Sequence, residues 1–286
     1  MGNKDFKIFN IDNRENNSFL LSIQNGLKNE GYFIAKKLIK LDFYNSVRSD
    51  SIDYFRSLEK DKHKLMEPIR GDISAGIKNN VGYCNNKYWH IFRSCFFSWN
   101  AIDEKNKNII KLSRNLSRLR NQVINKKDTY GFLIENNRDI AYTSLSHYPA
   151  NNGFLINHAD STNGEPVIHF KVELTHKGID YKEGGFFLID KKGIERDVSL
   201  ISQPGDVIFF DGSCAHGIRS IKGNDIGRIA LFEIPTKVNE ESRFSLYFND
   251  GWTIPSKIIY KISKLIQKTN KIIAIKLIRI LEIIGK

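Results

Sequence analysis

The sequence lacks the features that mark several common classes of protein. Its three cysteines, Cys84, Cys95 and Cys214, are scattered and odd in number, so they do not form a disulfide framework. This fits a reducing compartment, and we expect a cytoplasmic protein. No apolar run opens the chain and residue 6 is Phe, so we expect neither a secretory signal nor N-myristoylation. No internal repeat or low-complexity segment is visible, which argues against a repeat architecture.

The composition is that of a folded protein with a substantial core. Of the 286 residues 41% are hydrophobic and 12% aromatic, which suits a soluble globular domain with additions. The net charge of +12 is unevenly spread. Residues 256–286 hold seven Lys and one Arg against one Glu, a net of +7, which leaves +5 for the rest. We therefore do not expect a nucleic-acid partner.

The N-terminal part of the chain shows mostly helical patterns. Apolar residues at helical spacing predict helices over 17–28 and 42–58, with a short strand at 31–35 between them. Residues 68–86 contain Gly and Asn and are predicted to be a loop. The aromatic segment 87–100 is interpreted as core and not as a substrate-stacking surface. The remaining helical pattern, at 107–127, predicts a helix with a solvated basic face.

From Asp139 onward the hydrophobic period changes to two, which is typical of strands. Between 168 and 174 apolar residues alternate with His169, Lys171 and Glu173, which predicts a half-buried strand. The segments 185–190 and 194–200 flank Lys191-Lys-Gly193, a hairpin signal, and 207–210 and 226–234 add two more strands. Many short strands without intervening helices predict a β-sandwich or a β-barrel.

The C-terminal segment 256–286 mixes isoleucine and leucine with lysine at helical spacing. Its most apolar stretch, 272–284, is too short and too charged for a transmembrane span. A basic helix lying on an anionic membrane surface is one interpretation. A helix packed on the domain or on a partner is the other, and the sequence does not separate them.

Four residues in the β region suggest a metal site. His158-Ala159-Asp160 places an imidazole and a carboxylate two residues apart in an extended segment, so both point to the same side. His216 follows several strands later, and Arg228 begins the next strand. Two His and one carboxylate form the facial triad of non-haem Fe(II) oxygenases, which leaves three positions open for a 2-oxo acid and dioxygen.

The order of these residues and their surroundings resembles a known superfamily. Tyr148-Pro-Ala-Asn-Asn-Gly153 precedes the first ligands, Tyr181-Lys-Glu-Gly-Gly185-Phe-Phe-Leu188 resembles a Gly-Gly strand, and Pro204-Gly205-Asp206-Val-Ile-Phe-Phe210 leads to His216. Together they resemble the Fe(II)/2-oxoglutarate-dependent oxygenases, in their prolyl-4-hydroxylase-like branch. The resemblance covers about 140–236.

The resemblance implies a mainly β fold with helical additions. It implies a double-stranded β-helix core of the jelly-roll or cupin-like kind, flanked by N-terminal helices and a C-terminal helix. We expect a supporting region over 1–135, the oxygenase core over 136–240 and a terminal segment with a basic helix over 241–286.

Carried over by position, His158, Asp160 and His216 bind Fe(II), Arg228 binds the distal carboxylate of 2-oxoglutarate, and Tyr148 donates to the same carboxylate. No catalytic residue beyond the metal centre is expected. The resemblance implies dioxygen as oxidant, ascorbate as a stimulant, and hydroxylation of an unactivated C–H bond with release of succinate and CO2. The intact Asp160 favours hydroxylation over halogenation. Arg228-Ile-Ala230 departs from the family's pattern, so a second contact to the co-substrate is not identified.

Other interpretations remain open from the sequence. His158 and His216 could be structural, and His169 and His176 compete as ligands, although we expect a structural role for His169. Asn157 and Arg219 are candidates for substrate contact. The substrate could be a small metabolite, a peptide side chain or a lipid-linked sugar reached from the inner face of a membrane. A catalytically inactive cupin-like metal-binding or scaffold protein is the alternative function.

Overall fold

The computed structural model describes residues 8–10, 16–57, 81–96, 107–132, 135, 137, 139–162, 165–223 and 226–237. The segment 256–286 lies outside these residues, so its basic helix and its membrane contact stay predictions. Among the helices that are described, none is both long enough and apolar enough to span a bilayer.

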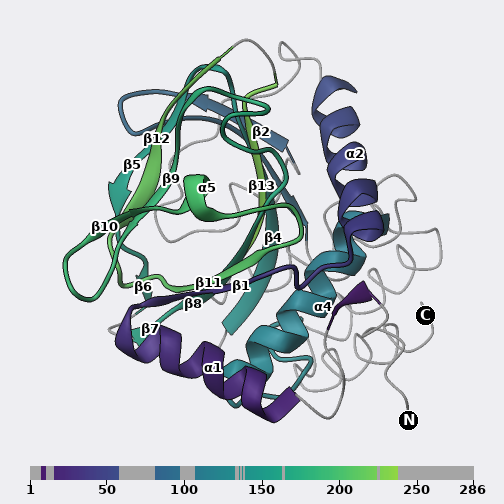
Figure 1. Ribbon diagram of the computed structural model, residues 1–286, viewed down its shortest axis with the longest axis vertical. Helices are drawn as coiled ribbons and strands as arrows, with labels where there is room; N and C mark the ends of the chain where they lie inside the picture. The colour runs from purple at the N-terminus through teal and green to yellow at the C-terminus, as the bar shows by residue number, and fades with distance from the viewer. Residues whose placement is uncertain are drawn as a thin grey trace, which may run out of the picture.

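One curled antiparallel sheet dominates the molecule (Figure 1). Its eleven strands are β1 Tyr32–Ala35, β2 Val81–Asn85, β3 Trp89–Phe96, β4 Asp139–Tyr148, β5 Asn151–His158, β8 Ile168–Glu173, β9 Glu183–Ile189, β10 Glu195–Asp197, β11 Val207–Asp211, β12 His216–Lys222 and β13 Arg228–Lys237. Two further strands, β6 Ser161–Thr162 and β7 Glu165–Pro166, pair only with each other.

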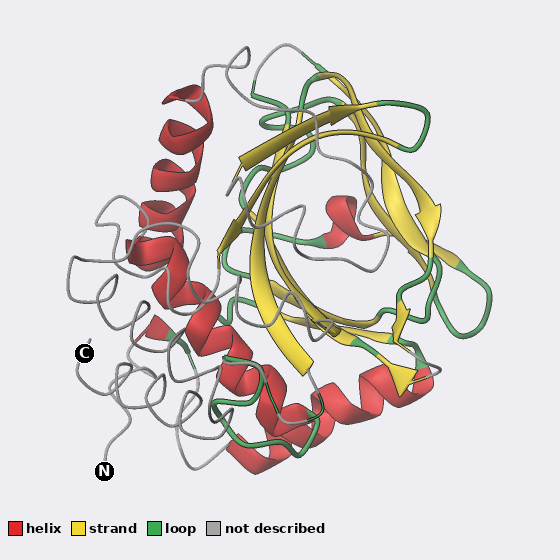
Figure 2. Cartoon of the chain, turned by 180° about the vertical axis from the view of Figure 1, so that it is seen from behind, coloured by secondary structure: helices red, strands yellow, loops and turns green. Residues whose placement is uncertain are grey.

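The strand order divides the sheet into two halves. The order is β1-β11-β8-β13-β4-β3-β5-β12-β9-β10, with β2 paired to β3. Strand β3 joins the halves because it pairs with β4 along one stretch and with β5 along another. The sheet curls until the two halves face each other, as Figure 2 shows from behind. The predicted mainly β fold with a double-stranded β-helix core is confirmed.

Three helices cover the outer face of the first half. They are α1 Asn16–Asn29, α2 Leu41–Ser57 and α4 Lys107–Val123, and a single turn, α5 Val198–Ile201, follows β10. Buried Leu112 and Leu116 of α4 share one apolar cluster with Val172 and Leu231 of the sheet. The predicted helices over 17–28 and 42–58 are therefore confirmed as α1 and α2, and their apolar stripes cover the sheet.

The basic face predicted for 107–127 is only partly solvated. Arg120 of α4 is 2% exposed and pairs with the equally buried Glu233 of β13. The prediction of a solvated face is wrong at this position, because α4 lies against the sheet and meets a carboxylate there. Helical spacing indicates which residues share a face, but it does not reveal a buried partner 113 residues away.

Strand β8 differs from its prediction in a way that shapes the site. Its apolar residues, such as Phe170 and Val172, pack under the helices as expected. Its polar residues are buried too, since His169, Lys171 and Glu173 are between 2% and 5% exposed. The predicted half-buried strand is wrong, because the curl of the sheet turns the polar face into the interior of the barrel.

Three strands of the large sheet lie where the sequence predicts no strand. Strand β2 falls within 68–86, which is predicted to be a loop, and β3 falls within the aromatic segment 87–100, which is predicted only to lie in the core. Strand β12 begins at His216, after the predicted strand at 207–210 has ended. The hairpin predicted around Lys191-Lys-Gly193 is confirmed, because β9 and β10 pair antiparallel on either side of it. Its second strand is shorter than the predicted 194–200, since it ends at Asp197 and the helical turn α5 follows.

Candidate metal centre

Strand pairing brings the predicted metal ligands together. His158 ends β5 and His216 begins β12, and the two residues are direct partners across this antiparallel pair. Their ring centroids are 4.4 Å apart. Asp160 follows β5 and is held by a hydrogen bond from its backbone N–H to the Gly212 carbonyl, 2.7 Å long. Residues 58 positions apart in the chain therefore converge at one end of the barrel.

The distances between the three side chains suit a metal ion. One ligand atom from each of His158, Asp160 and His216 lies within 4.8 Å of the other two. The Nε2 atom of His158 is 3.8 Å from Oδ1 of Asp160, and Nε2 of His216 is 3.5 Å from Oδ2. All three are the ligand types that a facial triad uses.

Backbone contacts fix which ring nitrogen of each histidine is free. Nδ1 of His158 lies 2.9 Å from the Ile156 carbonyl, and Nδ1 of His216 lies 2.8 Å from the Cys214 carbonyl. Since a carbonyl only accepts, each Nδ1 carries the hydrogen and each neutral ring keeps a lone pair on Nε2. Histidines that bind metals are commonly oriented by such a contact.

The electrostatics of the triad also favour metal binding. Burial lowers the pKa of His216 below its ordinary value, although Asp160 opposes this shift. A neutral His216 is the state that binds a divalent cation.

A third imidazole lies beside the triad. Nε2 of His169 is 3.2 Å from Oδ2 of Asp160, and its side chain is 2% exposed. Its ring is stacked on Phe210, with centroids 4.9 Å apart. The structure therefore places His169 against Asp160, beside the triad but outside the group of ligand atoms that lie within 4.8 Å of one another. His176 does not reach it, because its Nε2 bonds to the hydroxyl of Tyr44, 2.6 Å away.

Arg228 and Tyr148 also meet, deeper in the barrel. They are partners across β13 and β4, and the guanidinium lies 5.2 Å from the Tyr148 ring. Arg228 is fully buried and forms an ion pair with buried Glu173. Burial alone would lower the pKa of Arg228, but Glu173, Tyr181 and Tyr148 raise it above its ordinary value. A carboxylate of the protein itself thus already contacts the residue expected to bind 2-oxoglutarate.

Lys171 is a buried amine that the sequence interpretation missed. Its Nζ lies 3.3 Å from the centroid of the Phe186 ring and 5.4 Å from those of Phe210 and Phe232. No carboxylate lies within ion-pair distance of it among the described residues. Burial, reinforced by the charge of Arg228, lowers its pKa well below the ordinary value. The alternation of apolar and polar residues in β8 already placed Lys171 on the polar face of the strand. In a sheet that curls into a barrel, this face lies in the interior.

The two candidate substrate contacts lie on the outside of the barrel. Asn157 is exposed beside His158. Arg219 of β12 is 47% exposed, pairs with Glu195 and lies over the Phe187 ring. Neither side chain contacts the triad in the contacts that the structure describes.

Comparison with solved structures identifies the fold. A prolyl-4-hydroxylase from Pseudomonas putida is 14% identical, with a TM-score of 0.51 over 77% of this chain and 100% of that one. A prolyl hydroxylase from Trichoplax adhaerens, solved with a peptide from the oxygen degradation domain of hypoxia inducible factor, is 14% identical, with a TM-score of 0.53 over 80% and 93%. A 2OG-Fe(II) oxygenase family protein from Caulobacter crescentus is 13% identical, with a TM-score of 0.51 over 80% and 87%.

No family model and no curated protein sequence matches the chain. The structural likeness shows that the chain has the double-stranded β-helix fold of these oxygenases. The resemblance seen in its motifs is thereby confirmed at the level of the fold.

Proposed function

We propose that the chain is a non-haem Fe(II)- and 2-oxoglutarate-dependent dioxygenase that hydroxylates an unactivated C–H bond. The observation that carries the proposal is the convergence of His158, Asp160 and His216 within 4.8 Å. It is supported by two buried basic side chains in the same barrel, those of Lys171 and Arg228. The fold, shared with solved oxygenases, makes this reaction type the natural one.

The donor set fits iron better than it fits a hard cation. Two neutral imidazoles and one carboxylate are the ligands that non-haem Fe(II) sites use, whereas Mg²⁺ and Ca²⁺ prefer all-oxygen sites. His158, Asp160 and His216 would hold the ion. When bound, iron activates dioxygen, and 2-oxoglutarate supplies two electrons as it is decarboxylated to succinate.

The interior cluster of Lys171, Glu173 and Arg228 fits the distal carboxylate of the co-substrate. Glu173 pairs with Arg228 and forms no ion pair with Lys171 among the described residues. Nε and Nη1 of Arg228 have no hydrogen-bond partner within the described part of the chain. Buried donors of this kind are rarely left unpaired, so we infer that a ligand satisfies them.

Lys171 is the second co-substrate contact in this proposal. A carboxylate placed between Lys171 and Arg228 would favour the charged amine and offset the burial that depresses the pKa of Lys171. The side chains of β8 and β13 would thus orient the co-substrate along the barrel. Phe186 and Phe210, both buried beside Lys171, exclude water from this path.

The proposal for the substrate is broader than the proposal for the reaction. A peptide accompanies the Trichoplax neighbour, and a small metabolite, a peptide side chain or a lipid-linked sugar remain the candidates for this chain.

The test is turnover of 2-oxoglutarate. The unchanged chain with Fe(II) should release succinate at a slow basal rate, and a substrate screen should find compounds that raise this rate. Asp160→Ala should abolish the release while retaining the circular dichroism of the fold. A chain that binds iron yet releases no succinate with any compound would instead be an inactive cupin-like metal-binding protein.

A further inference from the structure

The buried carboxylate of Glu173 has one oxygen that accepts no hydrogen bond. Its Oε1 accepts from Nη2 of Arg228, and both side chains are buried in the barrel. Its Oε2 has no hydrogen-bond partner among the residues that the structure describes. An unpaired buried acceptor is costly, because burial removes the water that would otherwise donate to it. The chain therefore keeps an unused acceptor beside the guanidinium that is expected to bind the co-substrate.

The backbone around Glu173 is held in place by the fold. Glu173 is the partner of Ala230 in the pairing of β8 with β13. Its carbonyl accepts a hydrogen bond, 2.9 Å long, from the hydroxyl of Tyr44 in α2. The N–H of the next residue, Leu174, donates to the Ile229 carbonyl, also at 2.9 Å. The carboxylate thus has little freedom to bring Oε2 to another donor.

A co-substrate carboxylate satisfies only part of this cluster. Nε and Nη1 of Arg228 are donors without a partner in the described part of the chain, and oxygens of a ligand can accept from them. Oε2 of Glu173 is an acceptor, as are the oxygens of any carboxylate, so the two groups cannot bond without a hydrogen between them. Two carboxylates that meet in a buried site also repel each other, and such pairs commonly share one proton. One added proton would satisfy Oε2 and relieve this repulsion.

Lys171 is the competing site for that proton. Burial lowers the pKa of Lys171 well below its ordinary value, and a ligand carboxylate would act in the opposite direction. A proton on Lys171 would nevertheless leave Oε2 of Glu173 without a donor and facing the ligand. A proton on Glu173 supplies the missing donor, so it accounts for the unpaired oxygen as well as for the charge.

The other titratable groups around Glu173 offer no place for a further proton near neutral pH. Besides Lys171 and Arg228, they come from α2, β4 and the loop between β8 and β9, and they are Tyr44, Tyr148, His176 and Tyr181. Burial raises the pKa of each of the three tyrosines and lowers the pKa of His176. Above about pH 6.5 the tyrosines are therefore protonated already and His176 is neutral.

We propose that Glu173 binds the distal carboxyl group of the co-substrate through a shared proton, so that binding of one 2-oxoglutarate takes up one proton from solvent. Arg228 keeps its contact with Glu173 and binds the ligand with the donors that Glu173 leaves free. The bound state holds one proton more than the separate partners, so the affinity falls as pH rises, by up to about tenfold per pH unit. This assignment rests on the proposed function, because it takes 2-oxoglutarate to be the ligand.

Calorimetric titration of the full chain, with saturating Fe²⁺ under anaerobic conditions, measures this proton uptake. The heat of binding is compared at about pH 7.5 in two buffers that differ in ionisation enthalpy. The matched ligand is 2-oxopentanoate, which has the same 2-oxo acid end but no distal carboxylate, so that proton exchange at the metal end cancels. We expect 2-oxoglutarate to take up about one proton more than 2-oxopentanoate.

Glu173→Gln places an amide N–H where the shared proton would lie. We expect this variant to bind 2-oxoglutarate without the additional proton, and at least about tenfold more tightly than the unchanged chain at about pH 8. A structural role for the ion pair alone predicts weaker binding instead. His176→Gln, which replaces a buried histidine outside the cluster, is the matched control and should keep the proton uptake. Urea denaturation shows whether each variant is folded.

The outcomes separate this assignment from the proposed function. Equal proton uptake with the two ligands in the unchanged chain would overturn the assignment, even if Glu173→Gln did not fold. Loss of the additional proton in Lys171→Met but not in Glu173→Gln would place it on Lys171 instead. If 2-oxoglutarate binds no more tightly than 2-oxopentanoate, the co-substrate site of the proposed function fails, and this assignment fails with it.

Discussion

Strand β13 carries two buried arginine–glutamate pairs, one on each face of the sheet. On the outer face Glu233 pairs with Arg120 of α4, and on the inner face Arg228 pairs with Glu173 of β8. All four side chains are at most 3% exposed. The two pairs are thus matched in residue type and in burial.

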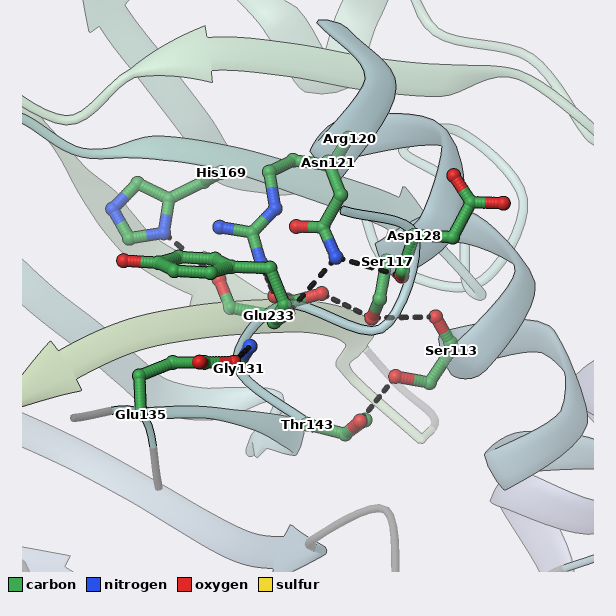
Figure 3. Close-up of polar contacts among 11 residues, drawn as sticks. Ser113, Ser117, Arg120, Asn121, Asp128, Gly131, Glu135, Thr143, His169 and Glu233 are labelled. Atoms are coloured by element: carbon green, nitrogen blue, oxygen red, sulfur yellow. Dashed lines mark hydrogen bonds and ion pairs between the residues drawn. The ribbon is translucent and has the colours of Figure 1, made fainter. Parts of the chain in front are cut away.

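The pairs differ in how fully they are satisfied. Both carboxylate oxygens of Glu233 accept a hydrogen bond, one from Arg120 and one from Ser117 (Figure 3). In the inner pair Oε2 of Glu173 and two guanidinium nitrogens of Arg228 have no partner within the described chain. The outer pair is closer to complete, because only Nε of Arg120 has no partner within the described chain, whereas the inner pair leaves three such atoms that a ligand could satisfy.

Breaking the outer pair should have the largest effect. Glu233→Ala leaves Arg120 buried without its counter-ion, and we expect the free energy of unfolding to fall by about 3–5 kcal/mol. Urea denaturation monitored by circular dichroism measures this loss. Saturating 2-oxoglutarate and Fe²⁺ should stabilise this variant and the unchanged chain equally, so the difference in the free energy of unfolding should remain. A loss below about 1 kcal/mol would show that the outer pair does not hold α4 to the sheet.

Removing both charges of a pair separates binding from folding. Arg228→Met combined with Glu173→Leu leaves no unpaired charge, and such replacements of buried ion pairs are often tolerated. We expect the half-saturation concentration for 2-oxoglutarate to rise at least about thirtyfold, because truncating a buried charged contact costs about 2 kcal/mol or more.

Arg120→Met combined with Glu233→Leu is the matched control for the outer face. It should leave the half-saturation concentration unchanged while the chain remains folded. Equal effects of the two double replacements would remove the distinction between the pairs.

Lys171→Met should have a smaller effect on the half-saturation concentration for 2-oxoglutarate. The substitution retains the apolar contacts with Phe186 but removes the cation, and we expect about a tenfold rise in half-saturation by 2-oxoglutarate. Iron content, measured by atomic absorption, should not change. A lower iron content with normal co-substrate affinity would instead assign Lys171 to the support of the metal centre.

The smallest expected effect is on the pH dependence of stability, through His176 and the groups around it. Burial lowers the pKa of His176, and the charge of Arg48 acts in the same direction. The carboxylates of Glu173, Asp180 and Asp206 oppose this shift. The folded chain therefore binds fewer protons here than the unfolded chain, and stability falls as pH drops below the ordinary value of about 6.5.

The slope from this one group is at most about 1.4 kcal/mol per pH unit. His176→Gln should flatten the dependence between about pH 5 and 6.5. Denaturation curves of both proteins across this range test the assignment. Identical slopes would show that His176 titrates in the folded chain as it does in the unfolded one.

Much of the fold follows from local patterns in the sequence. Alternation, turn residues and helical spacing predict most of the strands of the barrel and the helices α1 and α2. The meeting of the three candidate metal ligands is also predictable. In an extended segment the side chains of His158 and Asp160 lie on the same side, and His216 becomes the neighbour of His158 once β5 and β12 pair.

The remainder depends on how the sheet curls, which local patterns do not contain. Lys171 and His169 look like solvent-facing residues of a half-buried strand, and only closure of the barrel buries them. Arg120 looks like a solvated helix residue until β13 supplies Glu233. Each of these errors concerns a polar residue whose partner is distant in the chain.

The inner pair and the metal triad are tested together by one anaerobic titration. Fe²⁺ and 2-oxoglutarate added to the unchanged chain should give a weak visible charge-transfer band that saturates at one equivalent per chain. The band should be absent from Asp160→Ala and should need far more 2-oxoglutarate in the double replacement of Arg228 and Glu173. An unchanged chain that binds iron yet shows no band at saturating 2-oxoglutarate would contradict the account.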